Sequence, residues 1–267
     1  MIYVRTLILA GQALPIDDNL CKPAAMTDAL YKASYYKALH VGNDGDVAHY
    51  LSALSGPADV LELGCGAGRI ALPLMESGHR LLGVDSHRGL LAHAEAAGVP
   101  TLEADFTTLE IEERFDHVIL GYNGMYCLLS EAAVMRTLSV ARDHLRPGGR
   151  FHFDVWHADP FHYDSPRADA DYEVTESVGE CVVDGRTLDV LEQSRWRPEE
   201  QRLDVSYLYL DGDDLIHTGV IAQRYLLKDQ IESFLRAGGF STVRIFGDFK
   251  RGPVTDESDH LVIEATV

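Results

Sequence analysis

Between residues 57 and 160, short runs of apolar residues alternate with longer amphipathic segments. The apolar runs predict strands at 59–64, 79–85, 99–105, 115–122 and 150–156. The segments at 68–78, 89–98 and 131–149 have helical spacing, and Pro147 with two glycines is expected to end the last helix. Such alternation predicts a parallel sheet with helices on both faces, whose ligands bind at the carboxyl ends of the strands.

The pattern changes from about residue 171 to 226, where consecutive strands are predicted. Asp-Gly pairs at 184–185 and 211–212 are typical of hairpin turns, so this region is expected to be an antiparallel meander. A helix at 227–240 and a final antiparallel strand pair at 241–249 and 258–267 complete the predicted sheet.

These patterns predict three regions. Residues 1–56 form an N-terminal helical segment, broken by the turn-rich residues 41–46, that serves as a lid. Residues 57–160 and 227–267 form the α/β domain, and residues 161–226 form an inserted β subdomain on the substrate side. The apolar residues 2–9 are expected to pack as a strand or short helix on the body or on a second subunit, which leaves a homo-oligomer open.

Composition narrows the partners. The chain of 267 residues has a formal net charge of −19, so a phosphate backbone would be repelled and nucleic acid is not an expected partner. No apolar run is long enough to span a bilayer, and no membrane partner is expected. The four widely spaced cysteines form no CxxC pair, which argues against a zinc site and fits reduced thiols in a cytoplasmic protein.

A glycine-rich turn follows the first predicted strand of the α/β domain. Gly64, Gly66 and Gly68 allow the backbone to approach a ligand closely. A dinucleotide fingerprint would have glycine where Arg69 stands, and the Glu62 carboxylate would repel a pyrophosphate. The turn therefore favours a ligand that carries positive charge or N–H donors.

Polar residues follow the next strands at the same rim. Asp85 ends the second strand and is placed to accept hydrogen bonds from both ribose hydroxyls. Asp105 could accept from an adenine amino group beside the Phe106 ring, or could instead cap the residues that follow it. Asn123 follows the fourth strand.

These motifs, in their order along the chain, resemble those of the class I S-adenosylmethionine-dependent methyltransferases. The resemblance covers about residues 58–156. The resemblance implies a Rossmann-like seven-stranded sheet with the last strand antiparallel, and S-adenosylmethionine as cofactor with S-adenosylhomocysteine as product. It implies that Glu62 organises the turn and the amino-acid end of the cofactor. The residues expected to contact the cofactor are Glu62, Gly64, Cys65, Gly66, Gly68, Asp85, Ser86, Asp105, Phe106, Gly121, Tyr122 and Asn123. No metal site is expected.

The acceptor side is less defined. The meander resembles the lid of small-molecule methyltransferases, including glycine/sarcosine and amino-sugar N-methyltransferases. Tyr36 and His40 in the N-terminal segment are candidate catalytic residues, and Tyr35 is a candidate substrate contact. His157, or the nearby His162, could act as a general base for a hydroxyl acceptor.

Arg224 could bind an acceptor carboxylate or could form a surface ion pair on the meander. The predicted function is methyl transfer to a small molecule, with an amine nitrogen favoured over a hydroxyl. An NAD-dependent oxidoreductase and a non-catalytic S-adenosylmethionine-binding protein are the alternatives.

Overall fold

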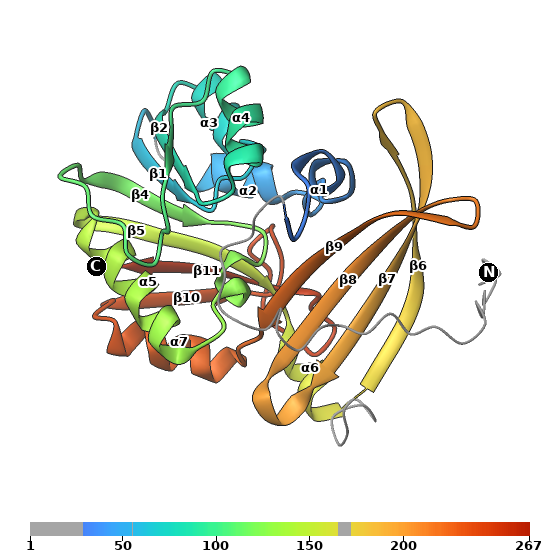
Figure 1. Cartoon of the computed structure of the whole chain (residues 1–267). Helices are drawn as coiled ribbons and strands as arrows, with labels where there is room; N and C mark the ends of the chain where they lie inside the picture. Colours follow the sequence, from blue (N-terminus) through green and yellow to red (C-terminus); the bar gives the residue numbers. More distant parts are fainter. Residues whose placement is uncertain (1–28, 55, 165–171) are drawn as a thin grey trace.

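The computed structural model describes residues 29–54, 56–164 and 172–267. Residues 2–9, predicted to pack on the body, lie outside this part. The described chain contains two sheets, one of seven strands and one of four. In Figure 1 the helix α1 (Ala33–Leu39) lies between them.

The seven-stranded sheet has the order β10-β11-β5-β4-β1-β2-β3. Its strands are β1 Asp59–Leu63, β2 Arg80–Asp85, β3 Thr101–Glu103, β4 Phe115–Leu120, β5 Leu145–Trp156, β10 Thr242–Phe246 and β11 His260–Thr266. β11 runs antiparallel to both of its neighbours, and the pairs among the first five strands are parallel. The predicted sheet, including its antiparallel last strand, is confirmed.

Helices cover both faces of this sheet. α2, α3 and α4 lie on one side and α5 and α7 on the other, as Figure 1 shows. Their bounds are α2 Asp46–Ala53, α3 Ala71–Glu76, α4 Arg88–Ala96, α5 Glu131–Asp143 and α7 Lys228–Ala237, and α6 spans Ala158–Asp164 after β5. The core between the sheet and α5 and α7 is built from buried aliphatic and aromatic side chains such as Leu61, Val118 and Phe151. Burial of this apolar surface is the main force that holds the helices to the sheet.

The helix predicted over 131–149 is shorter than expected. α5 ends at Asp143, and Leu145 pairs with Phe115 as the start of β5. Pro147 therefore lies in the strand, and the chain leaves the helix before reaching it. The prediction placed the end of the helix too late because Pro and Gly exclude helix without showing where a strand begins.

The four-stranded antiparallel sheet has the order β6-β7-β8-β9. Its strands are β6 Tyr172–Val183, β7 Arg186–Arg197, β8 Arg202–Asp211 and β9 Asp214–Arg224, with the short 3-10 helix η3 (Pro198–Glu200) between β7 and β8. The turn at Asp184 and Gly185 has positive φ at both positions, as a two-residue hairpin requires. The predicted meander and the turn at 184–185 are confirmed, whereas the second turn lies one residue later than predicted, at Gly212 and Asp213, because Asp211 still pairs with Asp214.

One face of the meander packs against α1. Buried residues of this contact include Tyr31, Val190 and Tyr209, with Tyr35 and Tyr36 packed beside them. The side chains of one face alternate with those of the other along each strand. On β9, Gly219 lies under the Tyr31 ring, so Arg224, five residues further along, belongs to the opposite face.

Candidate functional site

The glycine turn joins β1 to α3 and forms one wall of a cavity of about 450 Å³. Gly64, Gly66 and Gly68 have φ values of +67°, +53° and +83°, which a residue with a Cβ adopts only at a cost. These angles explain the three glycines of the sequence. They turn the chain sharply, so that its backbone faces the cavity.

The cavity contains most of the residues predicted around the turn. Predicted residues that line it are Tyr36, His40, Glu62, Gly64, Cys65, Gly66, Gly68, Gly121 and Tyr122. It is therefore bounded by the turn, by the end of α1 and by the end of β4. Its volume lies within the range of small-molecule and cofactor sites.

Glu62 is buried beneath the turn, and its Oε2 has no hydrogen-bond partner within the described chain. Burial raises the pKa of this carboxyl to about 8, and the negative charge of Asp85 acts in the same direction. A carboxylate here lacks a sufficient cationic partner within the protein. A ligand that brings an ammonium group would provide one.

Asp85, at the end of β2, receives two backbone hydrogen bonds. Its Oδ2 accepts from the Gly66 N–H and its Oδ1 from the His87 N–H, both at 2.8 Å. Burial raises the pKa of Asp85, and these two hydrogen bonds oppose that shift. The carboxylate thereby joins the glycine turn to the start of α4, with Ser86 between them in the chain.

Asp105 and Phe106 differ in their surroundings. The exposed Asp105 accepts a hydrogen bond at 2.8 Å from the Thr107 N–H, which is the capping alternative. Phe106 reaches the turn, because a Cβ built on Gly64 would lie 3.6 Å from its ring. Phe106 is therefore placed beside the turn, and the position of Asp105 leaves its adenine contact a proposal.

The end of β4 has an unusual backbone. Tyr122 and Asn123 have φ values of +53° and +61°, a left-handed conformation that is rare for a bulky residue. The buried Asp154 holds this conformation, since its Oδ1 accepts from the Tyr122 N–H at 2.9 Å and from the Tyr50 hydroxyl at 2.5 Å. The Asn123 amide oxygen accepts from the Trp156 N–H, so Asn123 connects the ends of β4 and β5.

Arg69 places a positive charge on the cavity wall, a role that was not predicted from the sequence. Its guanidinium pairs with Asp46 of α2 at 2.8 Å and lies 5.2 Å from the centre of the Tyr122 ring. The residue that breaks the dinucleotide pattern therefore fixes α2 to the turn and supports Tyr122. The motif identified the position, but only the fold shows its partners.

The lid residues divide between two surroundings. Tyr36 and His40 line the cavity with their rings 4.3 Å apart. Tyr35 instead packs against Tyr209 and His217 of the meander. Tyr35 therefore packs against the meander and is not among the residues that line the cavity, so its contact with substrate stays a prediction.

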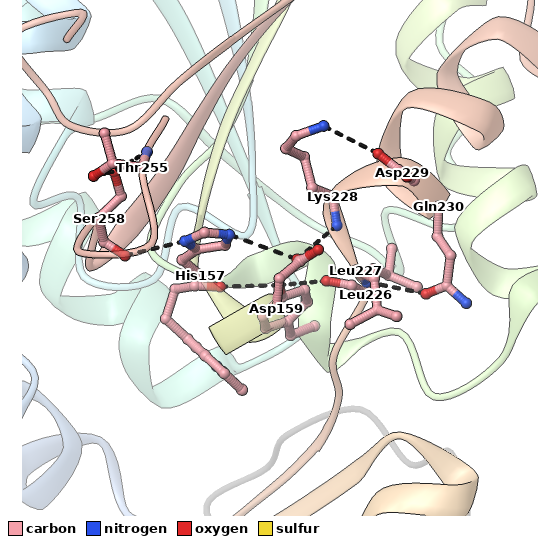
Figure 2. Close-up of polar contacts among 11 residues, drawn as sticks. His157, Asp159, Leu226, Leu227, Lys228, Asp229, Gln230, Thr255 and Ser258 are labelled. Carbon is pink, nitrogen blue, oxygen red and sulfur yellow. Dashed lines mark hydrogen bonds and ion pairs between the residues drawn. The ribbon is translucent and has the colours of Figure 1, made fainter. Parts of the chain in front are cut away.

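His157 is not among the residues that line the cavity, and Figure 2 shows its polar contacts. Its Nδ1 is 3.1 Å from the Ser258 carbonyl, and its Nε2 is 3.7 Å from Asp159. Asp159 in turn accepts from the Lys228 N–H. His157 thus connects α6, the start of α7 and the loop before β11, and its predicted role as a catalytic base is not supported.

His162 and Arg224 also have structural partners. His162 Nδ1 is hydrogen-bonded to the Tyr225 hydroxyl at 2.8 Å. Arg224 pairs with Glu131 at 3.2 Å on the meander face that points away from α1. Arg224 thus forms the ion pair that the sequence left open, and its carboxylate-binding role stays a prediction.

Two further findings concern membrane-spanning helices and metal sites among the described residues. None of their helices has both the length and the apolar character to cross a bilayer. No group of three or more His, Cys, Asp or Glu side chains among residues 29–54, 56–164 and 172–267 could hold a metal ion.

Known proteins with related sequences and structures are methyltransferases. A family model described as a methyltransferase domain matches residues 60–149. The CcbJ methyltransferase from Streptomyces caelestis superposes with a TM-score of 0.71 and 25% identity, over 83% of this chain and 88% of that one. Residues 60–149 therefore form a methyltransferase domain, as the sequence motifs predict.

Curated relatives match this methyltransferase domain over shorter stretches. A cypemycin N-terminal methyltransferase from a Streptomyces species is 31% identical over 42% of this chain and 46% of its own length. A ubiquinone biosynthesis O-methyltransferase from Methylobacterium nodulans is 34% identical over 42% of this chain and 45% of its own. The matches therefore span about half the length of these relatives.

A second solved structure, which contains a bound cofactor, has the same fold as this chain. The S-adenosylmethionine-bound amino pentose methyltransferase from Micromonospora echinaspora shares the fold, with a TM-score of 0.63 and 18% identity over 85% of this chain and 93% of that one. At this identity the similarity shows the fold, and S-adenosylmethionine stays the cofactor that the sequence motifs predict. The residues present fit it, because the unpartnered Glu62 oxygen and the nearby Asp85 suit the cofactor's ammonium group and ribose hydroxyls.

Proposed function

We propose that the protein methylates the nitrogen of a small-molecule amine. The observation that carries this proposal is one cavity that joins the acidic glycine turn to the aromatic wall of Tyr36, His40 and Tyr122. When bound, S-adenosylmethionine supplies a methyl group on a positively charged sulfur, which an acceptor can take by in-line displacement. The residues of the chain then need to hold the two reactants in line and exclude water.

A carboxylate near the aromatic wall supports an amine acceptor, whose nitrogen becomes positively charged as it takes the methyl group. Glu192 of β7 accepts hydrogen bonds from the Ser194 hydroxyl at 2.8 Å and from the Tyr207 hydroxyl. Within the described chain it has no ion-pair partner, and its charge acts on Tyr122 at the cavity. The ammonium group that forms when a neutral amine takes the methyl group is the complement that such a carboxylate lacks.

The names of the relatives include both N-methyltransferases and O-methyltransferases. The cypemycin N-terminal and amino pentose methyltransferases have names that indicate nitrogen acceptors. The ubiquinone biosynthesis O-methyltransferase keeps hydroxyl methylation as the second candidate. Since His157 lies outside the cavity, a hydroxyl acceptor would have His40 or His93, the two histidines on the cavity wall, as its candidate base.

The test is a screen for S-adenosylhomocysteine release. The panel pairs amines with alcohols of the same carbon skeleton, such as cyclohexylamine and cyclohexanol, and calorimetry measures S-adenosylhomocysteine binding separately. The proposal expects cofactor binding and methylation of amines over their paired alcohols. Methylation of alcohols alone would support the second candidate, and absence of cofactor binding would refute both.

Glu192 provides a sharper test with a matched control. Glu192→Gln is expected to lower kcat/KM for the preferred amine about tenfold and to leave S-adenosylhomocysteine binding unchanged. Glu176 faces Glu192 across the strand pair but is exposed, so Glu176→Gln is the control. Equal effects of the two variants would show that Glu192 has no specific role in binding the amine.

A further inference from the structure

A chain of hydrogen bonds connects the meander to His40 through two buried tyrosines. The Tyr209 hydroxyl lies 3.1 Å from the Tyr35 carbonyl oxygen and 2.5 Å from the Tyr31 hydroxyl. The Tyr31 hydroxyl lies 2.9 Å from His40 Nε2. Each hydroxyl has a single hydrogen, so the direction of the chain can be worked out.

The carbonyl of Tyr35 sets that direction, because a carbonyl oxygen only accepts. Tyr209 therefore donates its hydrogen to Tyr35, and the 2.5 Å contact between the two hydroxyls needs the hydrogen of Tyr31. Tyr31 has then no hydrogen left for His40, so His40 Nε2 must donate to the Tyr31 oxygen. The reverse direction would leave the Tyr209 and Tyr35 oxygens 3.1 Å apart with no hydrogen between them.

Tyr31 is itself fixed at two other points. Its ring lies on β9, where a Cβ on Gly219 would come within 2.3 Å of it. Its carbonyl accepts from His87 Nε2 at 2.9 Å, since His87 Nδ1 already accepts from the Leu90 N–H. His87 also donates its backbone N–H to Asp85, so Tyr31 connects the ribose side of the site to the lid.

The other nitrogen of the His40 ring is free to meet a ligand. His40 lines the cavity, and its Nδ1 is accessible and has no hydrogen-bond partner among the described residues. The ring lies between Tyr36 and Tyr207, with centroid distances of 4.3 and 4.9 Å. With Nε2 protonated, Nδ1 has a lone pair directed away from the tyrosine chain.

We propose that Tyr31 and Tyr209 are positioning residues that fix the His40 tautomer, so that Nδ1 accepts a hydrogen bond from the N–H of the methyl acceptor. This inference rests on the proposed function. A hydrogen bond of this kind orients the nitrogen lone pair toward the methyl group without moving a proton. Burial lowers the pKa of His40 to about 4, so the ring is neutral at neutral pH and suits an acceptor better than a base.

The first test needs no methyl acceptor. Nitrogen NMR of the full chain with ¹⁵N-labelled histidine and bound S-adenosylhomocysteine is expected to show His40 with its hydrogen on Nε2. Tyr31→Phe should shift His40 toward the other tautomer. Tyr126→Phe, which removes a buried hydroxyl bonded to main-chain carbonyls in the core, should leave the His40 signals unchanged.

The second test is turnover with the amine of the panel that is methylated fastest. Tyr31→Phe is expected to lower kcat about tenfold and to leave S-adenosylhomocysteine binding unchanged. His40→Asn can place an amide oxygen near the Nδ1 position and should retain more activity than His40→Ala or His40→Gln.

The outcomes separate this inference from the proposed function. An Nδ1–H tautomer in the unmodified protein, an unchanged tautomer in Tyr31→Phe, or full activity in His40→Ala would overturn the role of the tyrosine chain. Failure of every amine to yield S-adenosylhomocysteine would refute the proposed function, whatever the tautomer of His40 is found to be.

Discussion

Glu62→Gln should make the protein more stable at alkaline pH and weaken its cofactor binding. The folded-state pKa of Glu62 is about 8, compared with an ordinary value near 4.5, and burial is the main cause. Because this pKa is raised, the folded state retains a proton that the unfolded chain releases. Stability is therefore highest below pH 4.5 and falls as the pH rises toward 8.

The size of the effect follows from these two values. The complete loss is about 5 kcal/mol, from 3.5 pH units at 1.36 kcal/mol each. About 2 kcal/mol of it falls between pH 6 and pH 8. The free energy of unfolding of Glu62→Gln, relative to the unmodified protein, should rise by that amount over this interval.

Cofactor binding should depend on pH in the opposite direction. If the carboxylate meets the cofactor's ammonium group, binding must remove the proton from Glu62. The affinity for S-adenosylhomocysteine should then increase roughly tenfold between pH 6 and pH 7. Glu62→Gln removes this dependence as well as the ionic contact.

Urea unfolding and calorimetry at several pH values measure both effects. Glu76→Gln, at an exposed position on α3, is the control and should follow the unmodified protein. Parallel pH profiles for Glu62→Gln and the unmodified protein, in both assays, would show that the buried carboxylate is not the group responsible.

Three further predictions concern other buried polar groups. Asp85→Asn should weaken S-adenosylhomocysteine binding at least tenfold by calorimetry, and unchanged binding would remove the ribose assignment. Tyr126→Phe should lower the free energy of unfolding in urea by roughly 1–2 kcal/mol, because its hydroxyl bonds two main-chain carbonyls; no loss would mean water replaces it. Burial lowers the pKa of His117, beside His152, to about 4, so stability should fall as the pH drops below 6.5. In urea, His117→Gln should lose less stability than the unmodified protein between pH 7 and pH 5, and an equal loss would contradict this account.

The sequence was sufficient to predict the α/β sheet and most residues of the glycine turn that line the cavity. Local features carry this information, because the apolar runs mark the strands and the glycines require positive φ at the turn after β1. Glu62, Asp85 and Tyr122 all lie near the carboxyl ends of neighbouring strands. Topology alone then brings them to one rim.

The substrate side could not be predicted in the same way. Arg224 lies on a correctly predicted strand, but a shift of one residue in a strand reverses the face of every side chain. Only the pairing of Arg202 with Arg224 and of Tyr207 with Gly219 shows that Arg224 points away from α1. The contact between Tyr31 and Tyr209 joins positions 178 residues apart and has no local signal.

Three buried carboxylates explain why this turn suits a sulfonium cofactor. Glu62, Asp85 and Asp154 all have pKa values raised by burial, which means that the protein does not supply enough positive charge to ionise them freely. Arg69 is the nearby cation, but it already pairs with Asp46 at 2.8 Å. Two phosphates would add negative charge to this group and raise the energy of every carboxylate further. A ligand with an ammonium and a sulfonium group would offset the same charges, so the acidic residues around the turn favour such a cofactor over a dinucleotide by electrostatics as well as by the spacing of the glycines.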